Sequence, residues 1–167
     1  MGSTGKPLHA PLTDIGIGVY TAGVAMLVAG AFGFEPAAMA TGSVLAIAVG
    51  LIAAVPTIIT GLLDLFRIPA GSPARTVGWW HLTVMATATG MFAGTLRLQL
   101  AGYSDGEIIT SALVLGVVSQ VLLVVGGYLG GVLTFIYGVR VLNRRTAPPA
   151  DAIIPGRAGR DPEGASG

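Results

Sequence analysis

The chain has 167 residues, of which 53% are hydrophobic and only 10% are charged, and its formal net charge is +1. Soluble domains are about a quarter charged, so this composition cannot supply a water-soluble surface and indicates a membrane protein. The near-zero net charge excludes the basic surface that nucleic-acid binding requires. The lack of cysteine excludes disulfides, iron–sulfur clusters and thiol catalysis.

Four long apolar segments follow one another, and each predicts a transmembrane helix. The first uncharged run, between Asp14 and Glu35, is roughly 20 residues long and matches the thickness of the hydrocarbon core. The second run contains Pro56, which predicts a kink, and the fourth contains the glycine-rich stretch 126–131, where we expect the helix to flex. The expected helices span about 12–33, 37–66, 76–97 and 107–142.

The predicted fold class is therefore all-α integral membrane, an antiparallel four-transmembrane-helix bundle. Residues 1–145 form this single domain, and residues 146–167, rich in Pro, Gly and Ala, form a disordered cytoplasmic tail.

Charge sets the expected orientation, because Lys and Arg favour the cytoplasmic side of short loops. The side that holds both termini carries most of them: Lys6, Arg67, Arg75, Arg140, Arg144 and Arg145. The opposite side has Arg97 with three acids, Glu35, Asp105 and Glu107. We expect a multi-pass protein of the bacterial inner membrane with cytoplasmic N and C termini.

This topology brings distant polar residues to one depth near the cytoplasmic end. They are His9 and Asp14 from the first helix, Thr57, Thr60 and Asp64 from one face of the second, His81 from the third, and Tyr137 and Arg140 from the fourth. Ionisable groups at membrane depth are costly unless paired, and they mark functional sites.

Three interpretations of this cluster stay open. In the first, Asp14 and Asp64 cap helix ends or pair with Arg67 or Arg140, and the histidines form hydrogen bonds near the headgroups. In the second, His9 and His81 are the axial ligands of haem b, since haem in a bundle needs imidazoles on facing helices at matching depth.

In the haem interpretation, small residues leave room for the macrocycle: Gly16, Gly18 and Ala22 on the first helix and Ala88 on the third. The third interpretation is a divalent-metal or proton site. Its nitrogen and oxygen ligands would suit zinc, manganese or iron, and they are His9, Asp14, Asp64 and His81. No close spacing of His and acid supports such a metal site.

The glycines of the fourth helix form two small-xxx-small pairs, Gly126 with Gly130 and Gly127 with Gly131. Such pairs allow close helix packing. We expect these glycines to pack inside the bundle or between protomers, which leaves a scaffold that docks a partner helix as an alternative function.

Several motifs in this order resemble the uncharacterised bacterial membrane family called domain of unknown function 2231. They are Lys6-Pro7-Leu8-His9 leading to Asp14, Gly61-Leu62-Leu63-Asp64, His81, the stretch 126–131 and Tyr137-Gly138-Val139. The resemblance runs from about Lys6 to Leu142. It implies four transmembrane helices and, because some members are fused or adjacent to Rieske-type domains, a redox setting. It implies no established activity.

The chain departs from the family pattern at two places. Family members often have His-Pro-x-His-Pro at the entrance, where this chain has Lys6 for the first His and Ala10 for the second Pro. They also tend to have an acid and a His late in the fourth helix, where this chain has Val132 and Tyr137. A site with more than two imidazoles is therefore not expected.

The sequence leads to one main hypothesis, a small non-catalytic membrane subunit associated with redox chemistry that binds haem b between His9 and His81. The alternatives are a scaffold subunit without a cofactor and a metal- or proton-handling protein. The expected partners are the lipid bilayer and a membrane redox complex or a second copy of the chain, and we expect no enzyme activity of the chain by itself.

Overall fold

Helices build nearly all of the described chain, residues 9–139 of a computed structural model. Their bounds are α1 His9–Ala31, α2 Pro36–Arg67, α3 Pro73–Gln99 and α4 Thr110–Gly131, with a short 3₁₀ turn η1 at Leu100–Gly102 and a π-helical turn η2 at Val132–Ile136. The prediction of an all-α chain with four long helices is confirmed.

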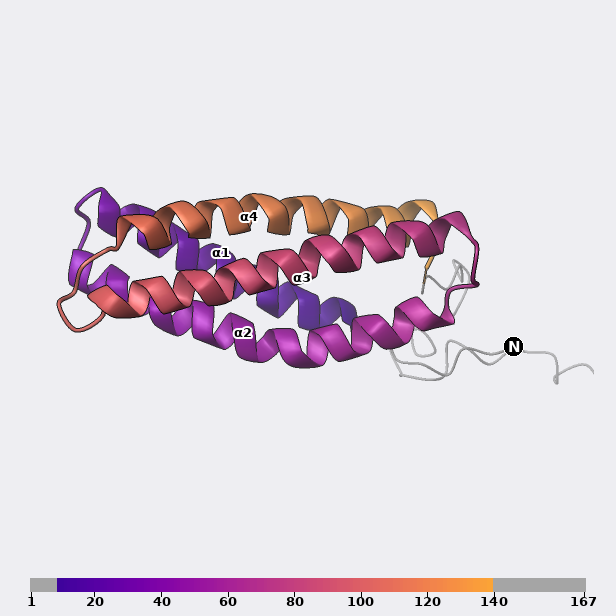
Figure 1. The fold of residues 1–167 in the computed structure, drawn as a ribbon, viewed down its shortest axis with the longest axis horizontal. Coiled ribbons are helices and arrows are strands. Elements are labelled where there is room, and N and C mark those ends of the chain that lie inside the picture. Colours follow the sequence, from indigo (N-terminus) through magenta and orange to yellow (C-terminus); the bar gives the residue numbers. More distant parts are fainter. Residues whose placement is uncertain (1–8, 140–167) are drawn as a thin grey trace, which may run out of the picture.

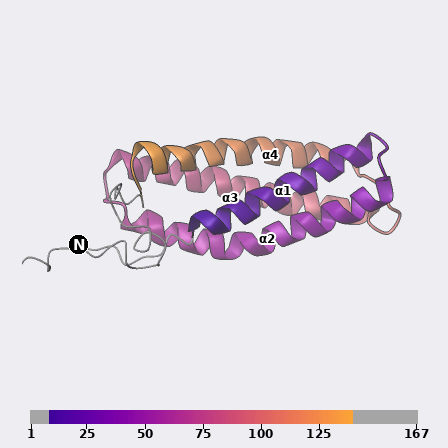
Figure 2. The ribbon, with the colours of Figure 1, turned by 180° about the vertical axis from the view of Figure 1, so that it is seen from behind.

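The helices run antiparallel in one elongated bundle (Figures 1 and 2). α1 packs mainly on α2, and α3 packs mainly on α4. The α2–α3 connection lies at one end, and the α1–α2 and α3–α4 connections lie at the other. α1 has 23 residues and α2 has 32, and α1 begins part of the way along the bundle (Figure 2).

The hydrophobic core occupies the middle of the bundle. It consists of Tyr20, Val24, Leu27, Ile47, Phe92 and Leu123. Leu27, Ile47 and Phe92 have no exposed surface, so side chains from α1, α2 and α3 interlock completely there.

Two helices, α3 and α4, begin at other residues than expected, and local hydrogen bonds explain both differences. α3 begins at Pro73, and the Ser72 side chain caps it by accepting a hydrogen bond of 3.3 Å from the backbone N–H of Arg75. α4 begins at Thr110, because Glu107 is held in the preceding loop by a 2.9 Å bond from its N–H to the carbonyl of Gly102.

The end of the fourth helix also differs from the expectation. The glycine stretch stays α-helical up to Gly131, and the irregular part is the π-helical turn that follows. The chain then leaves the helix at Gly138, whose φ of 62° favours glycine. The predicted tail 146–167 lies outside the described residues.

Pro56 lies inside α2, yet α2 remains one helix from Pro36 to Arg67. The ribbon of α2 bows outward along its length (Figure 1). The missing N–H of proline is thus accommodated by a gradual bend and not by a break.

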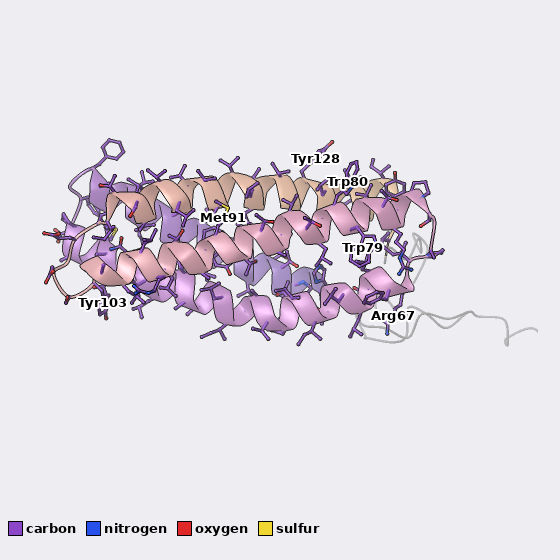
Figure 3. All side chains as sticks on the ribbon, viewed as in Figure 1. Arg67, Trp79, Trp80, Met91, Tyr103 and Tyr128 are labelled. Carbon is purple, nitrogen blue, oxygen red and sulfur yellow. The ribbon has the colours of Figure 1, made fainter. Side chains whose placement is uncertain are left out.

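Three described helical segments are long and apolar enough to cross a membrane: His9–Ala31, Pro36–Arg67 and Thr110–Ile136. α3 is long enough but less apolar. Side chains project from the whole outer surface, as the labelled Trp80 and Tyr128 do in Figure 3. Val121 and Val124 on α4 and Ile52 on α2 are more than half exposed. This surface suits contact with lipid.

Candidate functional site

A cavity of about 430 Å³ lies inside the bundle, toward the α2–α3 connection. All four helices line it, and both histidines of the chain are among the lining residues. Small-molecule sites usually measure about 300–1,000 Å³ and are mostly apolar with a few polar groups. The cavity has this size and character.

His9 lies in the first turn of α1 and is tied to α2. Its Nδ1–H donates to the backbone carbonyl of Thr57 at 3.0 Å. The Thr60 hydroxyl oxygen lies 3.4 Å from the same nitrogen, while its own hydrogen is used by backbone carbonyls of α2. A carbonyl oxygen can only accept, so Nδ1 carries the proton.

His81 is held in the same way by a different helix. Its Nδ1–H donates to the backbone carbonyl of Gly126 on α4 at 2.8 Å. His81 comes eight residues after Pro73, the first residue of α3, which places it about 12 Å along the helix. It therefore lies well inside the bundle.

The two imidazoles lie close together in the lining of the cavity. Their ring centroids are 6.4 Å apart and their planes are nearly perpendicular, at 85°. Since each Nδ1 is bound to a carbonyl, each Nε2 of the neutral ring keeps a lone pair for another bond. Histidines that bind metals are usually oriented in this way, with the second nitrogen donating to a carbonyl or carboxylate.

Glycines make the space for both rings. A Cβ added at Gly61 would lie 2.7 Å from Cε1 of His9, and one added at Gly130 would lie 3.2 Å from Cε1 of His81. Gly16 and Gly127 also line the cavity, and a Cβ at either would meet nothing within 4 Å. At Gly16 and Gly127, α1 and α4 therefore add no side chain to the cavity.

The other polar residues predicted for this site take different positions. Thr57 contributes its backbone carbonyl, because its hydroxyl donates to Ala53 at 2.8 Å. Asp14 and Asp64 both line the cavity. The carboxylate of Asp64 lies 3.6 Å from the guanidinium of Arg67.

Tyr137 follows the π-helical turn, is 41% exposed and does not line the cavity. Arg140 lies outside the described residues.

Two of the four glycines in the stretch 126–131 lie against α3, and a Cβ at Gly127 would meet nothing within 4 Å. A Cβ at Gly126 would collide with Met85 on α3. One at Gly130 would lie 3.2 Å from Cε1 of His81, which is also on α3. Gly131 is near Phe135 of its own helix. These contacts lie within the chain, and of the two glycines that approach α3, Gly130 is among the residues that line the cavity.

Sequence reasoning missed the residues at the inner end of the cavity. Tyr20 lies on the face of α1 that carries His9, and Met85 and Thr89 lie on the face of α3 that carries His81. The signal was the spacing, because residues 9, 13, 16 and 20 share one helical stripe, as do residues 81, 85 and 89.

The cavity lining offers two imidazoles as nitrogen donors. Among residues 9–139, no group of three or more His, Cys, Asp or Glu side chains is placed to hold a bare metal ion. Zinc sites in proteins use three or four such ligands. A group that brings its own equatorial ligands needs only two from the protein.

Known proteins identify the family of this chain. No curated protein and no solved structure matches this chain. The model of the predicted membrane protein family DUF2231 matches residues 5–143, which confirms the resemblance seen in the motifs. The chain thus belongs to the DUF2231 family of predicted membrane proteins.

Proposed function

We propose that this membrane protein holds haem b between His9 and His81 and serves as a non-catalytic, redox-associated subunit of the inner membrane. The observation that carries the proposal is the matched pair of imidazoles, each with Nδ1 bound to a backbone carbonyl of a neighbouring helix. A haem held by these two residues would supply one-electron transfer.

The spacing of the rings supports binding of one metal centre between them. With metal–nitrogen bonds of about 2.0–2.1 Å, two imidazoles that held one metal centre would have ring centres on the order of 6 Å apart. The His9 and His81 centroids are 6.4 Å apart. The porphyrin supplies four nitrogens, so these two side chains would complete the coordination of haem iron.

The walls of the cavity also fit a flat apolar group. Gly16 on α1 and Gly127 on α4 line it without a Cβ, and most of the remaining lining is apolar. The chain's own residues would orient both imidazoles and exclude water from the metal centre. Low polarity around a haem is one way in which a protein adjusts its potential.

We further propose that all four helices cross the bilayer, including α3. Its lower hydropathy comes partly from threonines, and several of these satisfy their hydroxyls within the helix. Thr83 donates to Trp79 at 2.9 Å and Thr87 donates to Thr83 at 2.9 Å, and both threonines are on the outer surface. A hydroxyl bound to a carbonyl one turn earlier is tolerated in lipid.

The proposed orientation places both termini in the cytoplasm. The α2–α3 connection, at the histidine end, carries Arg67 and Arg75, whereas the opposite connections carry Glu35, Asp105 and Glu107. This asymmetry follows the positive-inside rule. Trp79 and Trp80 near the start of α3 would lie at the cytoplasmic interface.

The visible spectrum of the gently purified protein tests the haem proposal. After expression with ample haem, we expect a Soret band that is lost in both His9→Ala and His81→Ala. Gly18→Ala is the matched control, because a Cβ there meets nothing within 4 Å and Gly18 does not line the cavity. A wild-type protein without the band, or a band that survives both histidine changes, would contradict the proposal.

A further inference from the structure

The inner end of the cavity contains a second polar feature, away from the histidines. Tyr20 is 3% exposed and lines the cavity, and its hydroxyl oxygen is buried without a hydrogen-bond partner. Thr89 on α3 approaches it, but no hydrogen bond with acceptable geometry forms. A buried hydroxyl without a partner is unfavourable, so an acceptor on a ligand in the cavity would stabilise it.

The ring of Tyr20 cannot turn away to find another partner. It stacks on Phe92 with centroids 4.0 Å apart and planes at 3°. On the side of α2, a Cβ at Gly50 would lie 2.5 Å from the ring. Because a helix and an aromatic side chain confine the ring, the direction of its C–O bond is set.

The lining around Tyr20 determines what kind of molecule could meet the hydroxyl. Ile17, Ala54, Met85 and Leu123 make this part apolar. No Lys or Arg is among the described residues that line the cavity, so an anionic group here would be buried without a counter-charge. A ligand that met the Tyr20 hydroxyl would therefore not be anionic, would be mostly apolar, and would carry a hydrogen-bond-accepting oxygen.

We propose that the inner end of the cavity binds the carbonyl group of a lipid-soluble quinone, with the Tyr20 hydroxyl as donor. Quinones dissolve in the bilayer, are neutral and present carbonyl oxygens at the edge of an apolar ring. Tyr20 is eleven residues beyond His9 on α1, about 16 Å of helix rise, so this subsite differs from the histidine pair. The proposal rests on Tyr20 and its surroundings and stands without haem.

Tyr20→Phe is the decisive variant, because it keeps the ring and its stack on Phe92 and removes only the oxygen. Without ligand, we expect the variant to melt at the same temperature as the wild type or higher, since the lost hydroxyl had no partner. With a decyl-substituted benzoquinone, we expect binding weaker by about 3- to 10-fold, the value of one neutral hydrogen bond. Quinone affinity and melting temperature are measured in detergent micelles.

Two controls make the result specific. Tyr128→Phe, at an exposed position on α4, should bind the quinone as the wild type does. A decylbenzene of the same length has no carbonyl and should bind wild type and Tyr20→Phe equally. Unchanged quinone affinity in Tyr20→Phe, or a lower melting temperature of this variant without ligand, would overturn the proposal.

The same preparations separate this proposal from the haem proposal. Tyr20 is not an axial ligand, so a Soret band present in the wild type should persist in Tyr20→Phe. Quinone binding that depends on Tyr20 in a protein without the band would refute haem and leave the quinone site standing. If the protein contains haem but its quinone affinity is the same in Tyr20→Phe, the quinone proposal is refuted and the haem proposal stands.

Discussion

At the end of the bundle that holds the α3–α4 connection, polar groups are satisfied inside the protein, whereas at the other end they face a cavity. The Gln99 side chain is completely buried at the first end. Its Nε2 donates to the carbonyl of Glu107 at 2.7 Å, and its Oε1 accepts from the N–H of Ile109 at 3.1 Å. At the second end, the imidazoles use one nitrogen each for the fold and leave the other available.

This difference assigns helix packing to one part of the bundle and ligand binding to another. Tight packing around Leu27 and Phe92 and the Gln99 hydrogen bonds hold the helices in place. At the histidine end, Gly16 and Gly127 line the cavity and add no side chain to it. We expect changes in the packed part to lower stability and changes in the open part to act mainly on ligand binding.

The largest expected effect on stability is that of Leu27→Ala. Leu27 has no exposed surface, so the change leaves a cavity that costs about 2–4 kcal/mol of unfolding free energy. Leu133→Ala, at a half-buried position that already lines the cavity, should cost less than half as much. Unfolding in mixed micelles measures both variants, and equal losses would contradict the division into a packed and an open part.

Gln99→Leu should have the next largest effect. It leaves the carbonyl of Glu107 and the N–H of Ile109 without their partner, at a cost of about 1–3 kcal/mol. Gln120→Leu is the matched control, because the Oε1 of Gln120 is buried without a hydrogen-bond partner and its Nε2 makes only one hydrogen bond, of 3.0 Å, to the exposed Thr21 hydroxyl. The same unfolding assay should show little loss for Gln120→Leu, and a larger loss there than at Gln99 would disprove the role of the Gln99 side chain.

Gly61→Ala should change stability least. Alanine favours the helix over glycine by up to about 1 kcal/mol, and this gain offsets the displacement of His9. The added Cβ would lie 2.7 Å from Cε1 of His9, so the ring must move. If the haem proposal is right, the Soret band per mole of protein should fall at least several-fold, while Gly18→Ala keeps it. An unchanged band in Gly61→Ala would mean that the position of His9 does not matter for binding.

Much of the fold followed from local features of the sequence. Apolar runs separated by Gly, Pro and charged residues predict four helices. The cap at Ser72 was not predicted, and α3 begins at Pro73 where residue 76 was expected. Family membership also followed from motifs in order along the chain. The start of α4 was predicted too early, because the bonds between Gly102, Glu107 and Gln99 close the loop through residues that no helix pattern reveals.

The site was predicted only in outline. Alternating helix direction brought His9 and His81 to a similar depth, but depth does not say which way a side chain points. Tyr137 was expected in the site and does not line the cavity, and Tyr20 was overlooked although it lies on the His9 face of α1.

By itself the sequence determined a membrane-type all-α chain, its four helices and the approach of two histidines, because helix length and hydropathy are local properties. Tertiary structure alone decided that the carbonyls of Thr57 and Gly126 orient the two imidazoles and that Tyr20 points at the inner end of a cavity. The physical reason is the apolar character of these helices on nearly every side. A helix that is hydrophobic all round carries little information about its rotation, and only packing against its neighbours settles which residues meet.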